Sequence, residues 1–318
     1  DAFPGAPAPA TVVIEADDVT SPQVQSQIAA LKRQALASGK ASKPITVAVN
    51  PAHTVARVDI PLAGKGDDDV SIAALGTLRG QVIPQTVGTL PNTQVAVTGL
   101  TAGTKDFNDQ MKSRMPIVIA FVLGLAFLLL LVTFRSIVVP LTAIALNLLS
   151  VGAAYGLLVA IFQHSWAEGM LGFTSNGAIT SWLPLFLFVV LFGLSMDYHV
   201  FIVSRIKELV DRGVPNDDAV SRGIRATAGT VTSAAVVMIA VFAIFATLRT
   251  LDVKQMGIGL ATAVLIDATV VRAVLLPATM KLLGDWNWYL PKWLDWLPSM
   301  TFETAHVEEH EAPPAIAA

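Results

Sequence analysis

The chain has 318 residues, of which 53% are hydrophobic and only 14% are charged. A soluble protein normally carries about a quarter charged residues. The deficit is concentrated after residue 115, so the composition predicts a membrane protein with a soluble N-terminal part. The net charge of −3 argues against a nucleic-acid partner, and the absence of cysteine excludes disulfides and thiolate metal sites. The chain begins at Asp1 without a signal-peptide pattern, and we interpret it as a piece of a longer protein.

The N-terminal part alternates between strand-like and helix-like patterns. Segments with the period-two alternation or β-branched content of strands are 11–16, 45–50, 54–62 and 93–100. Segments with apolar residues at helical spacing are 22–38 and 69–88. The order predicts a ferredoxin-like βαββαβ subdomain of the α/β class over residues 1–101. We expect a connecting helix at 102–115.

Five apolar runs are long enough to cross the membrane, which takes roughly 20 residues. The runs are 116–134, 138–162, 182–204, 227–248 and 256–283. Together they predict a five-helix transmembrane bundle over residues 116–284.

The distribution of Lys and Arg predicts the orientation of this bundle. The connection between the third and fourth runs carries Arg205, Lys207, Arg212, Arg222 and Arg225. The loop 163–181 has no Lys or Arg. The positive-inside rule therefore places residues 205–225 in the cytoplasm, the N-terminal subdomain on the external face and the C-terminus in the cytoplasm.

The last part of the chain divides into two segments. Residues 285–299, "DWNWYLPKWLDWLPS", hold four of the six tryptophans. Alternating aromatic and charged residues at a membrane edge indicate a helix that lies in the headgroup region as a surface anchor. Residues 300–318 have little apolar surface to bury, and we expect a disordered tail.

Titratable side chains interrupt the third run in the stretch "GLSMDYHVFIVSRIKE". A charge at the bilayer centre costs on the order of 3 kcal/mol, and such residues usually mark ion or proton pathways. Helical geometry places Gly193 on the face of Asp197, with Tyr198 about 100° around the helix. Because a glycine lets a neighbouring helix approach closely, we expect Asp197 to point inward. The alternative is a structural hydrogen bond between two helices, and the role of His199, about 200° from Asp197, stays open.

The fifth run carries a second carboxylate. Gly259, Ala263 and Asp267 follow at four-residue spacing, which predicts a small-residue stripe for close helix contact that ends at Asp267. Structural support and a role in proton transfer are equally open for Asp267. We expect Arg272 to extend to the cytoplasmic edge of the membrane.

The fourth run opens with "TAGTVTSAA", in which Thr232 and Ser233 could supply hydroxyl groups at a similar depth. The alternative for each is a hydrogen bond back to its own helix.

An intramembrane aspartyl protease with Asp197 and Asp267 as its pair is a further alternative. Such enzymes place GxGD at one aspartate, whereas "GLSM" precedes Asp197 and "VLI" precedes Asp267. The sequence shows no His/Cys metal set, nucleophile elbow or phosphate-binding loop. We therefore predict neither an enzyme nor a bound metal or cofactor.

Three stretches carry a family resemblance: "FGLSMDYHVFIVSRIKE", "FRSIVVPLTAIALNLLSVGAAYGLL" and "GIGLATAVLIDATVVRAVLLPATM". They resemble the MMPL (mycobacterial membrane protein large) subfamily of RND transporters. The resemblance covers nearly all of residues 10–285. It corresponds to the C-terminal half of such a transporter, from the second external porter domain through the last five of twelve spans.

The resemblance implies a proton-driven exporter of lipids or other amphipathic molecules in the bacterial cytoplasmic membrane. Asp197 and Tyr198 match the family's Asp-Tyr pair of the proton relay, which faces an equivalent pair in the N-terminal half. Asp267 and Arg272 match the family's last-span pattern, as relay or support. The implied partners are the N-terminal half, protons, membrane lipids and the amphipathic substrate. The alternative is a non-transporting, sterol-sensing-like lipid-binding or scaffold protein, which has no need of titratable groups in mid-membrane.

Overall fold

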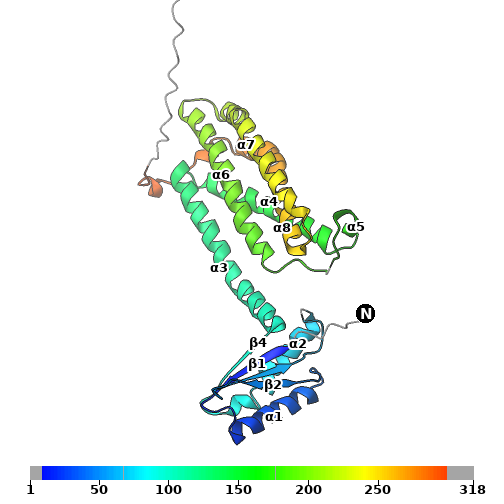
Figure 1. Ribbon diagram of the computed structural model, residues 1–318. Helices are drawn as coiled ribbons and strands as arrows, with labels where there is room; N and C mark the ends of the chain where they lie inside the picture. The colour runs from blue at the N-terminus through cyan, green and yellow to red at the C-terminus, as the bar shows by residue number, and fades with distance from the viewer. Residues whose placement is uncertain (1–8, 67, 176, 299–318) are drawn as a thin grey trace, which may run out of the picture. The chain divides into compact units, whose positions relative to one another are not determined.

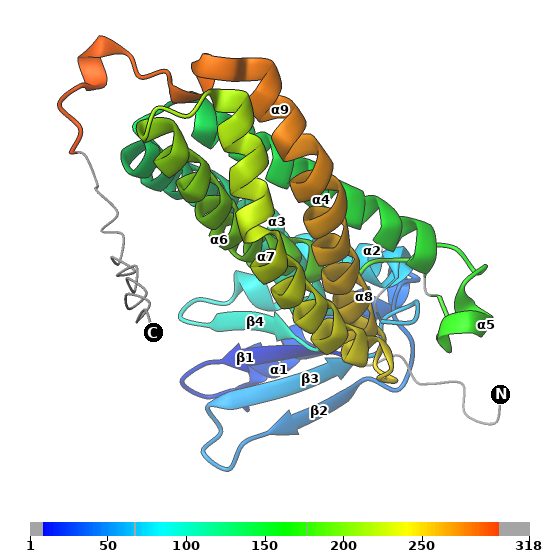
Figure 2. The ribbon, with the colours of Figure 1, turned by 90° about the horizontal axis from the view of Figure 1, so that it is seen from above.

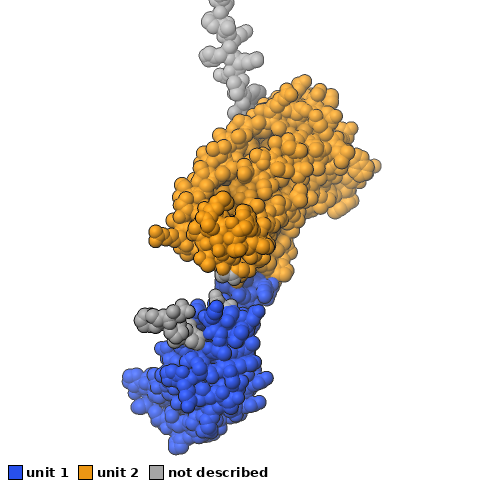
Figure 3. All heavy atoms as spheres, turned by 90° about the vertical axis from the view of Figure 1, so that its right-hand side faces the viewer, with its two compact units in different colours: residues 1–114 blue, residues 115–318 orange. Residues whose placement is uncertain are grey.

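The computed structural model describes residues 9–66, 68–175 and 177–298. The predicted tail at 300–318 lies outside the described residues. The chain divides into two compact units, Asp1–Arg114 and Met115–Ala318, which are described separately (Figure 3).

The first unit contains one antiparallel sheet of four strands in the order β2-β3-β1-β4 (Figure 2). The strands are β1 (Ala10–Glu15), β2 (Thr46–Val49), β3 (Val55–Ile60) and β4 (Gln94–Thr98). Helix α1 (Pro22–Ala37) connects β1 to β2, and α2 (Asp69–Thr77) follows β3. The predicted ferredoxin-like βαββαβ order is confirmed.

The core of this unit lies between the two central strands and the helices. Alternate residues of β1 and β3 are buried, as expected when successive side chains of a strand point to opposite faces. Ile28 and Leu31 of α1 and Leu75 of α2 belong to the same buried cluster. Strand β2 lies at the sheet edge and all four of its residues are exposed.

The segment predicted as one helix at 69–88 is interrupted. Helix α2 continues as a π-helical turn, η1 (Leu78–Val82), and a short 3-10 turn follows as η2 (Val87–Thr89). Pro84 has no N–H to continue the helical hydrogen bonds. A Cβ at Gly88 would lie only 2.8 Å from the carbonyl oxygen of Ile83, so the chain folds back tightly at this glycine.

Five helices are long and apolar enough to cross a membrane, as predicted (Figure 1). The first four are α3 (Leu100–Phe134), α4 (Val138–Phe162), α6 (Leu183–Asp211) and α7 (Asn216–Ala246). The fifth consists of α8 (Leu251–Ile266), a π-helical segment η3 (Asp267–Leu275), α9 (Leu276–Leu283) and the 3-10 turn η4 (Gly284–Trp288). A short helix, α5 (Glu168–Leu171), lies in the loop after α4.

Helix α6 is central in the second unit. It packs against α4, α7 and α8, and half of its most apolar window is buried. The corresponding buried share is 17% for α3 and 11% for α7. These two helices therefore leave most of their apolar surface for lipid or for another protein segment.

The aromatic segment near the C-terminus is not the continuous helix that the sequence predicted. It forms η4 and a second 3-10 turn, η5 (Lys292–Leu294), with Pro291 between them. Leu294 and Leu297 are buried in one cluster with Leu131 of α3. The exposed aromatic side chains of the segment are Trp286, Tyr289, Trp293 and Trp296. Its attachment to the membrane surface stays a prediction.

Candidate functional site

Asp267 and Arg272 form a buried ion pair in the fifth membrane helix. The Nε of Arg272 donates to Oδ2 of Asp267 at 3.3 Å. The side chains of Arg272 and Asp267 are only 3% and 8% exposed. The expectation that Arg272 extends to the membrane edge is therefore wrong.

The π-helical segment η3 explains this correction. Five positions along an α-helix turn about 140° away from the starting face, so Asp267 and Arg272 would point apart. A π-helix closes hydrogen bonds from residue i to residue i+5, which stacks the sixth residue over the first. Because η3 begins at Asp267, this geometry brings Arg272 onto the same face as the carboxylate.

The guanidinium of Arg272 also contacts helices α6 and α4. Its Nη1 lies 2.6 Å from Nδ1 of His199, and its Nη2 donates to the carbonyl oxygen of Ser195 and, at 3.4 Å, to Oδ1 of Asn147. Arginine has donors only, so Nδ1 of His199 accepts and the ring proton is on Nε2. Helices α4, α6 and η3 thus meet at one charged group.

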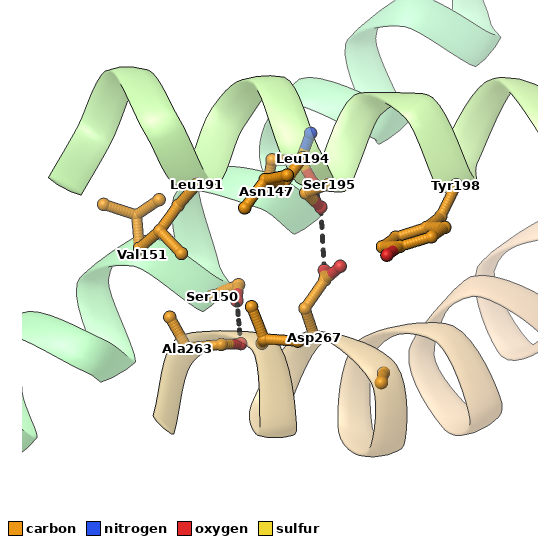
Figure 4. Close-up of a pocket in the computed structure, with 11 residues that line it drawn as sticks. Asn147, Ser150, Val151, Leu191, Leu194, Ser195, Tyr198, Ala263 and Asp267 are labelled. Atoms are coloured by element: carbon orange, nitrogen blue, oxygen red, sulfur yellow. Dashed lines mark hydrogen bonds between the residues drawn. The ribbon is translucent and has the colours of Figure 1, made fainter. Parts of the chain in front are cut away.

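Ser195 lies between the carboxylate of Asp267 and the side-chain amide of Asn147. Its hydroxyl lies 2.9 Å from Oδ1 of Asp267, to which it donates (Figure 4). The same hydroxyl is also within hydrogen-bonding distance of Oδ1 of Asn147. A hydroxyl has one proton, so it can serve only one of these two acceptors at a time. When this hydroxyl donates to Asp267, Oδ1 of Asn147 accepts from Arg272 instead.

The sequence did not single out Asn147 or Ser195, and it left His199 unassigned. All three side chains are buried, at 1%, 7% and 1% exposure respectively. Asn147 is the one amide in the apolar run 138–162. An amide inside a membrane helix is costly without partners, which is a signal that could have marked this position.

Asp197 lies on the opposite side of α6 from this cluster. It is exposed, and no hydrogen bond or ion pair to it occurs among the residues that the structure describes. Asp197 is two positions from both Ser195 and His199, which is about 200° around an α-helix. Because these two residues take the buried face, Asp197 faces away from the other helices of this chain. The predicted inward orientation is wrong for this chain.

The glycines of the two carboxylate faces also differ. A Cβ at Gly193 would meet no atom within 4 Å, so the predicted close contact is not formed within the described chain. A Cβ at Gly259 would lie 3.0 Å from Leu158 and 3.1 Å from Leu187, so the bundle packs tightly there. Ala263 is buried, and its carbonyl oxygen accepts from the hydroxyl of Ser150 at 3.4 Å.

The remaining residues that the sequence singled out are Tyr198 on α6 and Thr232 and Ser233 on α7. Tyr198 is partly buried, and its hydroxyl lies 3.4 Å from the sulfur of Met238. Thr232 and Ser233 are exposed on α7, and the hydroxyl of Ser233 donates back to the carbonyl oxygen of Thr230. The structure therefore brings neither hydroxyl to the buried cluster. Among the described residues, no three His, Cys, Asp or Glu side chains are grouped to hold a metal ion.

The buried cluster and the exposed Asp-Tyr pair both lie within the part of the chain that matches a known protein family. The sequence profile of the MMPL family matches residues 3–298. The chain belongs to the MMPL family.

Individual MMPL proteins match over nearly the whole chain. The heme uptake protein MmpL11 of Mycobacterium tuberculosis is 39% identical over 94% of this chain. The mycolic acid-containing lipids exporter MmpL11 of Mycolicibacterium smegmatis is 38% identical over the same share. The trehalose monomycolate exporter MmpL3 of Mycobacterium tuberculosis is 30% identical over 90%.

The chain spans about a third of the length of these relatives, between 30% and 31%. It is homologous to their C-terminal third. The MMPL family consists of membrane transporters and not of enzymes, so the protease alternative is not supported.

Proposed function

We propose that this chain is the C-terminal part of a proton-driven exporter of lipids or other hydrophobic or amphipathic molecules, which acts across or out of a bacterial cytoplasmic membrane. Relatives named as exporters of mycolic acid-containing lipids and of trehalose monomycolate support this substrate class. A relative named as a heme uptake protein also carries a hydrophobic cargo, in the other direction. The proposal therefore names the class of cargo and not one molecule.

The observation that carries the proposal is the position of Asp197. A carboxylate in the middle of an apolar helix costs about 3 kcal/mol, and it is retained where it has a partner or a task. The described chain supplies no partner, and the neighbouring Gly193 leaves room for another helix. We expect a polar group of the N-terminal half to complete this site, with Asp197 as the proton carrier and Tyr198 beside it.

The cluster around Asp267 has a supporting role in this proposal. Its ion pair with Arg272 and the switchable hydroxyl of Ser195 form a buried polar connection between helices α4, α6 and η3. A carboxylate that gains a proton would lose its attraction to Arg272, so the packing of these helices would respond to protonation.

The orientation follows the distribution of basic residues. Residues 205–225 are on the cytoplasmic side, and the ferredoxin-like unit is on the external side as a porter subdomain. A proton that enters the cytoplasm releases about 2.3 kcal/mol per 100 mV of membrane potential. This inward flow would drive the export of the cargo.

Asp197→Asn in the full-length protein tests the proposal. The amide has nearly the size and hydrogen-bonding capacity of the carboxylate, but it cannot carry a proton at neutral pH. We expect normal amounts of membrane-inserted protein and at least a hundredfold loss of cargo efflux, which corresponds to about 3 kcal/mol. The measurement is efflux from membrane vesicles with an imposed pH gradient.

Asp211→Asn is the matched control. Asp211 is at the end of the same helix, is exposed and pairs with Lys207 at the surface, where ion pairs contribute little. We expect this variant to transport normally. Gradient-driven efflux by Asp197→Asn at the unaltered rate would show that Asp197 is not an obligatory proton carrier.

A further inference from the structure

Residues 284–298, which follow α9 and are called the strap below, have two faces with opposite properties. On the inner face the side chains of Asn287, Leu294 and Leu297 are buried. The outer face carries aromatic side chains that are between 52% and 76% exposed, namely Trp286, Tyr289, Trp293 and Trp296. The inner face is therefore held by the protein, and the outer face is open to whatever surrounds this end of the bundle.

The inner face of the strap is bonded to the turn between α3 and α4. The backbone N–H of Ile137, the hydroxyl of Ser136 and the guanidinium of Arg135 each donate to a carbonyl oxygen of the strap, at 3.1, 2.6 and 3.0 Å respectively. The acceptors belong to Tyr289, Asn287 and Asp295. These bonds use the backbone of the strap, so they leave the exposed aromatic rings free.

The strap also contacts the ends of α6 and α7. The indole Nε1 of Trp288 donates to Oδ1 of Asn216, the first residue of α7, at 3.3 Å. The ammonium of Lys207 on α6 lies 5.1 Å from the centre of the same ring, which is within the range of a cation–π contact. Trp288 is thus the aromatic residue of the strap that packs inward, and the strap joins four helices of the bundle at one end.

The strap covers one side of the end of α3. Leu131 of α3 is buried in one cluster with Leu294 and Leu297, and Phe127 and Val132 pack against it (Figure 1). Only 17% of the most apolar window of α3 is buried within the chain. The strap therefore supplies apolar packing that this sparsely covered helix needs at its end.

The outer face continues the surface of a membrane helix. The strap contains η4, the last turn of the fifth membrane helix, so it lies at the edge of the spanning region. Leu282, just before it, is 87% exposed, as expected for a side chain that faces lipid. Trp and Tyr rings are enriched at this depth, because they combine an apolar body with a polar N–H or O–H group.

The charges of this region do not select a charged partner. Lys281 and Lys292 are balanced by Asp285 and Asp295. A polybasic segment gains about 1 kcal/mol per basic residue from an anionic membrane surface, and this cancellation removes most of that gain. The aromatic rings are left as the main source of affinity.

We propose that the strap is a lipid-binding element. Its exposed aromatic rings lie in the headgroup layer of the membrane, and its inner face ties the end of α3 to that layer. The rings of Trp286 and Tyr289 stack with their centres 5.8 Å apart and offer lipid one continuous surface. The assignment to the cytoplasmic leaflet rests on the orientation in the proposed function, whereas the lipid contact requires only that the bundle spans a membrane.

A nitroxide label at Trp296→Cys tests the outer face. The full-length protein, with any other cysteine replaced, is placed in phosphatidylcholine bilayers, and collisions of the label with oxygen and with a water-soluble nickel complex are measured. The control is a label at Val49→Cys on the edge strand β2. We expect the label at 296 to be roughly threefold or more less accessible to nickel than the control, and open to oxygen. Added anionic phosphatidylglycerol should leave both values unchanged.

Two results would overturn the lipid contact. A label at 296 as open to nickel as the label at Val49 would place the strap in water. A label shielded from both reagents would show that a protein surface covers it. An unaltered protein whose efflux is independent of the pH gradient would contradict the proposed function and leave the lipid contact standing.

The neighbours Trp293 and Leu294 separate the two faces of the strap. Leu294→Gln places an amide against Leu131, and we expect roughly tenfold faster hydrogen exchange in the last turns of α3. Trp293→Gln should leave this exchange unchanged but make the label at 296 more accessible to nickel. Equal exchange in the two variants would contradict the tie to α3. If Leu294→Gln does not fold, the label in the otherwise unaltered protein still decides on the lipid contact.

Discussion

Asp267 and Asp197 are both carboxylates of membrane helices, and this chain surrounds them very differently. Asp267 is 6% exposed and has hydrogen bonds from Arg272 and Ser195. Asp197 is exposed, and a Cβ added at Gly193 on its face would meet no atom within 4 Å. A buried carboxylate with a fixed cation holds helices together, whereas one on an unfilled face is available to a group from elsewhere. Under the proposed function, Asp267 belongs to a supporting site, and Asp197 belongs to a site that another part of the transporter would complete.

The largest effect that would sharpen this comparison is expected from Arg272→Met. The substitution leaves the charge of Asp267 buried and uncompensated, which typically costs about 3–5 kcal/mol. We expect a strong fall in the melting temperature and the amount of full-length protein. Asp267→Leu combined with Arg272→Met removes both charges, and we expect it to regain most of the stability. A double variant as unstable as Arg272→Met would contradict the role of the ion pair.

The glycine pair tests the two faces directly. Gly259→Leu forces a side chain against Leu158 and Leu187, and overpacking of this kind costs about 1–3 kcal/mol. A Cβ at Gly193 meets no atom within 4 Å, so we expect Gly193→Leu to leave stability nearly unchanged but to slow transport. The measurements are thermal unfolding and gradient-driven efflux of the full-length protein. Equal losses of stability in the two variants would show that the face of Gly193 is not free within this chain.

Two tyrosines allow a smaller and more specific comparison. Tyr198→Phe removes a hydroxyl whose one hydrogen-bond contact among the described residues is the sulfur of Met238. We expect a loss of efflux rate of less than about tenfold, which corresponds to one hydrogen bond. Tyr155→Phe is the control, because its hydroxyl donates to the carbonyl oxygen of Pro184 and joins α4 to α6. We expect Tyr155→Phe to lower the melting temperature and to leave the rate per folded molecule unchanged. A lower melting temperature for Tyr198→Phe and slower efflux for Tyr155→Phe would contradict the assignment of Tyr198 to the face of α6 that carries Asp197.

The smallest expected effect concerns a carboxylate outside the membrane. Hydrogen bonds from the hydroxyl and the backbone N–H of Ser71 hold the pKa of Asp68 below its ordinary value of 3.8. The stabilising contribution of this N-terminal cap is therefore complete above pH 3.8 and is lost as the pH falls through the lower, folded-state pKa. We expect Asp68→Ala to speed hydrogen exchange in the first turn of α2 at neutral pH but not at about pH 2.

Asp69→Asn is the control for Asp68→Ala, because Asp69 is inside the helix and does not cap it. An equal change in hydrogen exchange for both variants would show that general charge, and not the cap, is responsible. Compared with the two membrane carboxylates, Asp68 has water as an alternative partner, so its loss affects only the local turn.

The sequence predicted the elements well where one pattern dominates. Period-two alternation at 54–62 and helical spacing at 22–38 led to β3 and α1 within a few residues. Apolar runs of about 20 residues led to all five membrane helices, because lipid leaves a spanning segment few alternatives to a helix. At Pro84 and Pro291 the predicted helix was too long, because a proline has no N–H to continue the helical hydrogen bonds.

The sequence by itself thus determined the βαββαβ order, the number of membrane helices and the presence of two carboxylates within them. Only the tertiary structure decided which carboxylate is buried. The pairing of Asp267 with Arg272 depends on a π-helical segment, and a spacing of five residues looks like two separate faces when α-helical geometry is assumed. The inward face of α6 went to Ser195 and His199 because they meet Arg272 and Asp267 across the bundle, and this left Asp197 on the outer face. Such contacts join residues more than 70 positions apart, and no local pattern in the sequence records them.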